Sequence, residues 1–203
     1  MSNDPYAAPS ANLDNSANAT TIQTSTWSAK GRLSVLSYLG QLFAAMLVFF
    51  VVLGVLGFIG SMLMGGPSGI SNVVEGGDFS NPVLIVLGLV GIVLLIAFIY
   101  VTVCMMIKRL HDRNHSGWWS LLVFVGSFIP FVNLVVFIGS LYIMFWPGHK
   151  HANRFGAPRT TRGWEKVLGI LYILFIVAAI VAGIAGGAAM MTGMPDLPGL
   201  PTG

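Results

Sequence analysis

The chain has 203 residues, of which 55% are hydrophobic and only 8% are charged, and its mean hydropathy is +0.82. Soluble domains carry about 25% charged residues, so this composition excludes an ordinary soluble fold and indicates a protein embedded in lipid. The net charge is only +3 and the basic residues flank apolar runs, so we expect no nucleic-acid partner despite an isoelectric point near 9.2.

The chain order predicts one helical membrane domain, at 27–191, between two tails. Residues 1–26 are rich in Ser, Asn, Ala and Thr without apolar periodicity, and residues 192–203 contain three prolines, so both tails are predicted to be disordered. The first tail lacks the basic start and short apolar core of a signal peptide. The first span is therefore expected to stay in the membrane as an anchor.

Four apolar runs are each long enough to cross a hydrocarbon core about 30 Å thick. They are Leu42–Met64, Val83–Ile107, Trp119–Trp146 and Val167–Met191. Between the first two runs, residues 65–81 hold several glycines and prolines together with Glu75 and Asp78, which predicts a flexible acidic loop. The fold class is therefore predicted to be all-α and polytopic.

The distribution of charge predicts how the third run meets the membrane. All ten Lys and Arg fall in three clusters, before the first run, after the second and before the last. The positive-inside rule favours a cytoplasmic position for all three, whereas a full crossing by Trp119–Trp146 would leave five of the ten outside. Pro130 and Asn133 lie at the middle of this run, where a proline interrupts a helix.

Each half of the run would be about 18 Å long as a helix, too short to cross. We therefore predict three full transmembrane helices plus a re-entrant helical hairpin, with the amino terminus in the cytoplasm. Four full transmembrane helices, the third kinked at its proline, are the alternative, because membrane helices tolerate proline when neighbours satisfy the freed carbonyl.

Small residues in the last run predict a close helix contact. Ala179, Gly183 and Gly187 recur every four residues, so another helix could approach this face closely. The contact could be within the chain or could form a homo-oligomer. No run carries an ionisable side chain at mid-depth, which weighs against a proton- or ion-coupled transporter.

Three motifs accompany the basic clusters. They are GRLS at Gly31–Ser34, RLHDxxxSGWW at Arg109–Trp119 and FWPGxxxxNRFG at Phe145–Gly156. In this order they resemble the domain-of-unknown-function-805 family of bacterial inner membrane proteins, the YhaH-like group, over about residues 27–158. The resemblance implies a helical protein of the inner membrane, and it implies no biochemical activity.

One interpretation of the motifs is structural. Asp112 would pair with Arg109 or Arg113 and cap the helix that follows, with His111 orienting the turn. Asn153 and Arg154 would bond back to that turn, so that two cytoplasmic loops close into one polar lid.

A second interpretation is recognition of anionic lipid headgroups, because basic clusters beside tryptophans attract such lipids by about 1 kcal/mol per Lys or Arg. The candidate headgroup or structural residues are Lys108, Arg109, His111, Asp112, Arg113, Lys150, Asn153 and Arg154.

The sequence leaves two further functions as alternatives. A zinc-dependent membrane hydrolase could use His111 and His115, which are four residues apart, with Asp112 as base and His149 or His151 as a third ligand. A small oligomeric channel or transporter could run along the hairpin at its central proline and asparagine. We favour a non-enzymatic protein that needs no cofactor and whose partners are the bilayer and its anionic lipids.

Overall fold

The structure is a computed structural model that describes residues 25–76 and 80–192. Within these ranges all the regular secondary structure is α-helical, and the connecting loops contain one isolated β-bridge. The predicted disorder of the two tails concerns residues that lie outside this description, except for Ser25, Thr26 and Thr192.

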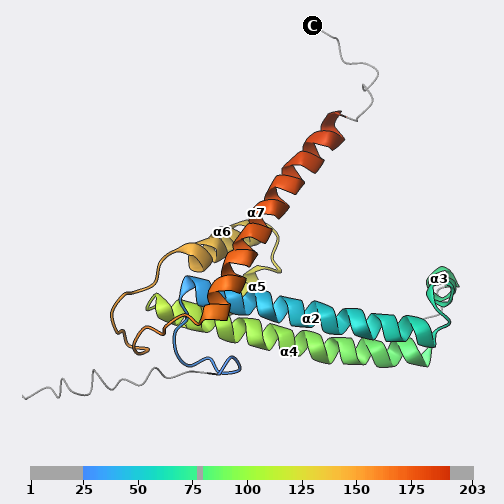
Figure 1. The fold of residues 1–203 in the computed structure, drawn as a ribbon, viewed down its shortest axis with the longest axis horizontal. Coiled ribbons are helices and arrows are strands. Elements are labelled where there is room, and N and C mark those ends of the chain that lie inside the picture. Colours follow the sequence, from blue (N-terminus) through green and yellow to red (C-terminus); the bar gives the residue numbers. More distant parts are fainter. Residues whose placement is uncertain (1–24, 77–79, 193–203) are drawn as a thin grey trace, which may run out of the picture.

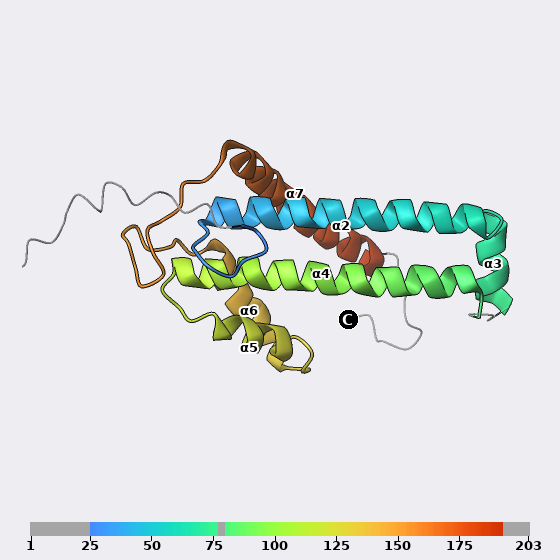
Figure 2. The same cartoon turned by 90° about the horizontal axis from the view of Figure 1, so that it is seen from below.

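Two long antiparallel helices, α2 (Val35–Leu63) and α4 (Pro82–Asp112), lie side by side along the molecule (Figures 1 and 2). Ser34 begins α2 because its Oγ accepts from the N–H of the third helical residue at 3.3 Å, and Asn81 Oδ1 begins α4 in the same way at 2.9 Å. Both helices are longer than the apolar runs that predicted them. The additional turns are at the beginning of α2 and at the end of α4, next to the GRLS and RLHD motifs.

The connection between these helices differs from the predicted flexible loop, because it contains α3 (Pro67–Gly76). The chain turns at Gly65 and Gly66, whose φ values of 94° and 80° suit glycine, and Pro67 then occupies the first helical position, where its missing N–H costs nothing. Three consecutive helix breakers thus form the turn, while Gly69 and Gly76 are accommodated within α3. Asp78 lies outside the described residues.

The third apolar run forms a helical hairpin, α5 (Trp118–Gly126) and α6 (Val132–Phe145). With 9 and 14 residues, the two helices are about 14 Å and 21 Å long, so neither crosses a 30 Å core. Pro130 lies in the turn between them, and both ends of the hairpin lie at the same end of α4 (Figure 2). The prediction of three long helices plus a hairpin is confirmed.

The last helix, α7 (Gly163–Thr192), crosses the beginning of α2 and then leads away from the α2–α4 pair (Figure 1). The crossing is close because Gly40 of α2 has no side chain, and a Cβ there would overlap the backbone of Glu165. Farther along α7, a Cβ added at Gly183 or Gly187 would meet no atom within 4 Å beyond the helix's own nearby backbone. The predicted small-residue face thus makes no contact within the described chain at these two glycines.

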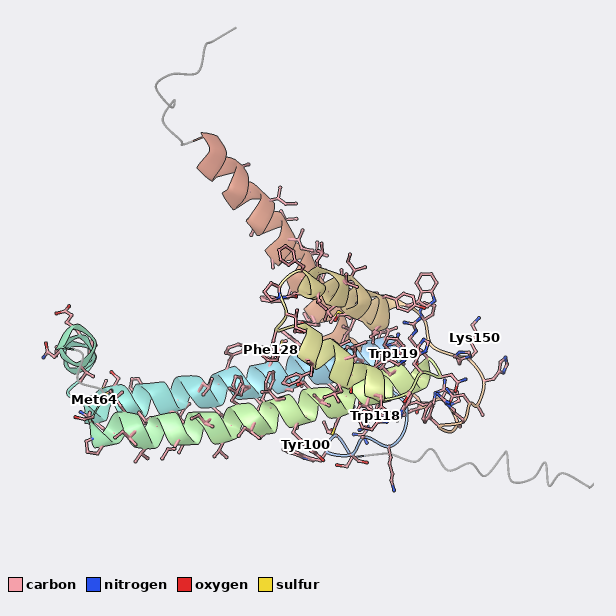
Figure 3. All side chains as sticks on the ribbon, turned by 180° about the vertical axis from the view of Figure 1, so that it is seen from behind. Met64, Tyr100, Trp118, Trp119, Phe128 and Lys150 are labelled. Carbon is pink, nitrogen blue, oxygen red and sulfur yellow. The ribbon has the colours of Figure 1, made fainter. Side chains whose placement is uncertain are left out.

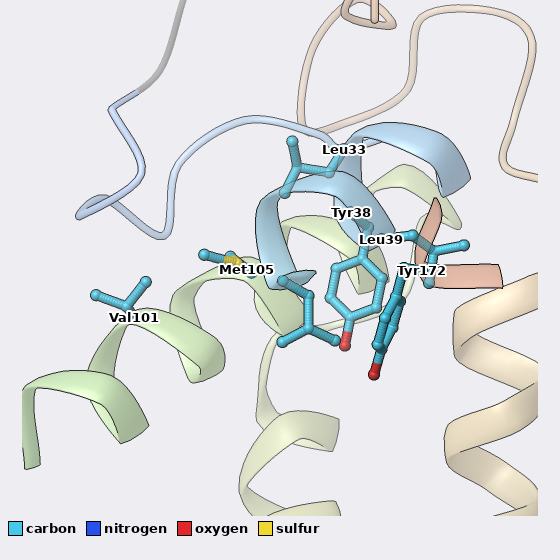
Figure 4. Packing of buried hydrophobic residues seen from close by; sticks show 7 residues of the cluster. Leu33, Tyr38, Leu39, Val101, Met105 and Tyr172 are labelled. Carbon is cyan, nitrogen blue, oxygen red and sulfur yellow. The ribbon is translucent and has the colours of Figure 1, made fainter. Parts of the chain in front are cut away.

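The buried apolar core lies at the crossing of α2, α4 and α7 (Figure 4). It consists of Leu33, Tyr38, Leu39, Leu42, Val101, Met105 and Tyr172. Most large apolar side chains beyond this core are exposed, as expected for helices that face lipid. Tertiary packing is therefore concentrated at the end of the molecule where the sequence motifs also lie.

Candidate functional site

All ten Lys and Arg are carried by the ends of helices and the loops that gather at one end of the molecule. In Figure 3, Lys150, Trp118 and Trp119 lie at this end, whereas Met64 lies at the opposite end beside α3. The first cluster precedes α2, the second ends α4, and the third precedes and begins α7.

A buried ion cluster forms the centre of this end. Asp112 Oδ1 lies 3.0 Å from a terminal nitrogen of Arg32, and Asp112 Oδ2 lies 2.7 Å from one of Arg109. The three residues, here called the arginine cluster, are 5%, 2% and 0% exposed. The predicted pairing of Asp112 with Arg109 is present. The predicted cap is not, because the residue before α5, Gly117, has no side-chain capping bond and both Asp112 oxygens face arginines.

Arg32 also holds the loop that follows α6. Its guanidinium donates to the backbone carbonyl of His151 at 2.8 Å, to that of Gly156 at 3.0 Å and to that of His149. The sequence interpretation gave Arg32 a role only in topology and missed this one. Its position inside the GRLS motif was the signal that could have identified it.

Arg109 and Arg113 close the carboxyl end of α6. Arg109 donates through Nε to the carbonyl of Ile143 at 3.0 Å and through a terminal nitrogen to that of Trp146. Arg113 donates to the carbonyl of Tyr142 at 3.1 Å and stacks 3.7 Å above its ring. The last carbonyls of a helix lack partners within it and carry partial negative charge, so two guanidinium groups stabilise this helix end.

The carboxyl end of α4 is closed by residues from the other two motifs. The N–H of Leu33, in GRLS, donates to the carbonyl of Lys108 at 3.2 Å. The N–H of His149 donates to the carbonyl of Asp112 at 2.9 Å, and Asn153 Nδ2 donates to that of His111 at 2.8 Å. All three motifs therefore meet at one helix end, which we call the motif junction (residues 31–34, 108–113 and 145–156).

The outer layer of the motif junction is aromatic and basic. The His111 ring stacks on Phe155 with their centroids 3.8 Å apart, and the Arg154 guanidinium lies 4.7 Å from the same phenyl ring while donating to the carbonyl of Asn114 at 3.1 Å. Beneath it, Gly148 leaves room for the carboxylate of Asp112, which a Cβ would overlap. The structure thus brings the two loops together as one lid.

The predicted headgroup residues separate into two groups. Lys108 and Arg109 are fully buried and Arg113 is 7% exposed. Lys108 donates to the carbonyl of Ser25, and the two arginines bond as described above, so these cations hold the fold together. Lys150 and Arg154 are exposed and remain accessible to a headgroup.

A match to a known protein family covers all the residues of the motif junction. The family model DUF805, described as a protein of unknown function, matches residues 26–157. The chain belongs to the DUF805 family. No curated protein and no solved structure matches the chain. The matched range begins beside Trp27 and ends just after Gly156, the last carbonyl that Arg32 binds, so the DUF805 unit coincides with the elements that the motif junction ties together.

Outside the DUF805 match, α7 is joined to α2 through a second buried acid. Glu165 is fully buried and accepts bonds from Ser37 Oγ at 2.9 Å, Gln41 Nε2 at 2.8 Å, the N–H of Arg162 at 3.0 Å and the guanidinium of Arg159. Sequence reasoning did not single out this residue. Its place as the one acid among the basic residues before the last span was the available signal.

The residues of the zinc alternative do not assemble. Within the described ranges, no group of three His, Cys, Asp or Glu side chains could hold a metal ion. Asp112 is occupied by arginines and His111 is stacked on an aromatic ring. Partial burial and neighbouring positive charge lower the pKa of His115, which favours a neutral ring at pH 7. His111, the histidine of the RLHD motif, therefore takes part in packing the motif junction.

Proposed function

We propose that this DUF805 protein is a non-enzymatic protein of the bacterial inner membrane whose basic cytoplasmic face binds anionic lipid headgroups and so organises the surrounding bilayer. The orientation follows from the gathering of all ten Lys and Arg at one end, because the positive-inside rule favours the cytoplasm for that end. The amino terminus would then be cytoplasmic, and α3 would face the other side of the membrane.

The observation that carries the proposal is the layer of exposed tryptophans beside the exposed cations. All five tryptophans of the chain are exposed at the basic end: Trp27 61%, Trp118 77%, Trp119 54%, Trp146 57% and Trp164 45%. Indole rings prefer the boundary between headgroups and acyl chains. The exposed cations Lys30, Lys150, Arg154 and Lys166 belong to the same loops and helix ends, so they would lie at headgroup level.

The motif junction supports this function by fixing the exposed cations in place. Lys150 and Arg154 lie on the loop whose backbone is bonded by the buried Arg32 and whose Asn153 is bonded to α4. A loop that is already ordered loses little conformational entropy when a lipid binds. The buried cations of the junction thus position the exposed ones.

The proposal is tested by tryptophan quenching in vesicles that contain brominated lipids. The full chain is reconstituted in phosphatidylcholine with equal mole fractions of brominated phosphatidylglycerol or brominated phosphatidylcholine. We expect stronger quenching by the anionic lipid, and we expect Lys150→Ala with Arg154→Ala to weaken this preference by about five-fold per residue, which corresponds to about 1 kcal/mol each.

Thr160→Ala, an exposed neutral change in the same loop, is the matched control and should leave the preference unchanged. A second control, Lys150→Arg with Arg154→Lys, keeps both charges and should retain most of the preference. Equal quenching by the two lipids, or a preference that is the same in the alanine variant as in the parent, would overturn the proposal.

A further inference from the structure

A groove runs between α2 and α4 on a face that is separate from the motif junction. It has a volume of about 300 Å³, and its lining is almost entirely apolar. Its lining includes small residues, Ala44 and Ala45 on α2 and Ala97 on α4, where the neighbouring positions carry larger side chains. Because both walls are membrane-spanning helices, the space lies open to the bilayer.

The groove is about as long as one leaflet of the hydrocarbon core is thick. Its lining on α2 extends from Gln41, near the basic end, to Val52, which is about 16 Å farther along the helix at 1.5 Å per residue. This distance is about half of a 30 Å hydrocarbon core. An acyl chain that starts at the basic interface would therefore reach the end of the groove near the bilayer centre.

The basic end of the groove is built to receive a headgroup. Trp27 and Trp164 line it from two different segments, and Trp27 is held there because its carbonyl accepts from the Tyr100 hydroxyl at 3.0 Å. Two exposed lysines belong to the same segments without lining the groove: Lys30 is three residues after Trp27, and Lys166 is two residues after Trp164 in α7. The entrance thus has two amphipathic rings, and the segments that carry these rings also carry exposed lysines.

One buried polar atom at this end lacks a partner. Gln41 is 6% exposed and lines the groove; its Nε2 donates to Glu165, and its Oε1 accepts no hydrogen bond. The amide orientation is fixed because a carboxylate can only accept from the NH₂ group. A buried acceptor without a partner is unfavourable, and a ligand hydroxyl that moved aside the side chains covering this atom would satisfy it.

We propose that this groove is a binding site for one acyl chain of an anionic phospholipid whose headgroup carries hydroxyl groups, with Gln41 Oε1 accepting a headgroup hydroxyl. The inference rests on the proposed function and names the lipid class. The apolar lining, the length of the groove, the lysines on the segments that carry the entrance tryptophans and the unpaired acceptor each match one part of such a lipid.

The test uses the full chain with fluorescence left only at the groove entrance. Three tryptophans outside the groove lining are replaced by phenylalanine: Trp118, Trp119 and Trp146. Quenching of Trp27 and Trp164 is then compared among brominated phosphatidylglycerol, phosphatidylmethanol and phosphatidylcholine at equal mole fractions. Phosphatidylmethanol is anionic but has no headgroup hydroxyl, so it separates charge from hydrogen bonding.

We expect phosphatidylglycerol to bind about five-fold more strongly than phosphatidylmethanol, the effect of one hydrogen bond. Ala97→Phe fills the groove and should abolish this difference, whereas Ala182→Phe, an exposed change on α7, should keep it. If Ala97→Phe fails to give a monodisperse protein, Ala44→Phe fills the groove from α2 and gives the same test.

Equal binding of phosphatidylglycerol and phosphatidylmethanol, or no effect of filling the groove, would overturn the groove site. Quenching that falls as the protein-to-lipid ratio rises would also overturn it, because a second copy of the chain would then occupy the groove. These failures differ from failure of the proposed function, in which neither anionic lipid is preferred over phosphatidylcholine by either set of tryptophans.

Discussion

Replacing Asp112 with Asn tests whether the arginine cluster stabilises the fold. The substitution keeps the shape of the side chain but removes the only acid that the structure places against the guanidinium groups of Arg32 and Arg109 within the described cluster. The NH₂ group of the new Asn would also face the guanidinium group of Arg32 or Arg109, and neither guanidinium can accept a hydrogen bond.

The expected cost follows from the burial of all three side chains. Arg32 and Arg109 are 2% and 0% exposed, so neither charge can turn to water when the carboxylate is lost. Removing one partner of a buried ion pair costs about 3–5 kcal/mol. The backbone carbonyls bonded to both arginines remain, so we expect a loss within this range and retention of the helical fold.

The assay is unfolding of the purified protein in mixed micelles, titrated with a denaturing detergent and followed by circular dichroism. Glu75→Gln is the control, because Glu75 is an exposed acid on α3 at the other end of the molecule, and its free energy of unfolding should change by no more than about 0.5 kcal/mol. If Asp112→Asn changes the free energy of unfolding by less than about 1 kcal/mol, the carbonyl groups alone compensate both cations and our reasoning is wrong.

Three further predictions concern packing and orientation. Gly148→Ala should lower the free energy of unfolding by about 1–3 kcal/mol in the same assay, because its Cβ overlaps the carboxylate of Asp112. Gly40→Ala should have a similar cost, because α7 must move away from α2, and it should lower the yield of a disulfide engineered across that crossing. A cysteine at exposed Thr160, in a Cys104→Ser background, should resist a membrane-impermeant maleimide in intact cells and react after permeabilisation.

The controls for these predictions use positions with free space. Gly183→Ala should not lower the free energy of unfolding, because no atom lies within 4 Å of the added methyl group and Ala favours the helix more than Gly does. The packing explanation fails if this variant is destabilised as much as the variants at the two close approaches. Labelling of position 160 in intact cells would place the basic end outside and contradict the proposed orientation.

The hairpin could be predicted because it depends on the positions of charged residues and of one proline, which can be read from the sequence. The preference of Lys and Arg for the cytoplasmic side limits how many times the chain can cross the membrane between basic clusters. Pro130 then marks the place where the third apolar run turns. The helix α3 was missed because several glycines and prolines in one segment suggest a loop, and composition does not show that Gly65, Gly66 and Pro67 stand together at the turn.

The buried charges could not be predicted in the same way. Arg32 and Asp112 are 80 residues apart, and no periodicity connects them. Charge counting treats each cation as a marker of topology and gives no indication that Lys108 and Arg109 are fully buried whereas Lys150 is exposed. Burial depends on which loops pack together, and that is a property of the tertiary fold.

The bonds of Arg32 also set an order for biosynthesis. Its partner carbonyl at Gly156 lies 124 residues later, so at 5–20 residues per second the ribosome needs about 6–25 s to supply it after Arg32 has been made. During this interval α2 can already be inserted while its flanking arginine is still hydrated. Complete closure of the motif junction must therefore follow synthesis of the hairpin, and a chain released before Gly156 would lack the last of the bonds that Arg32 makes.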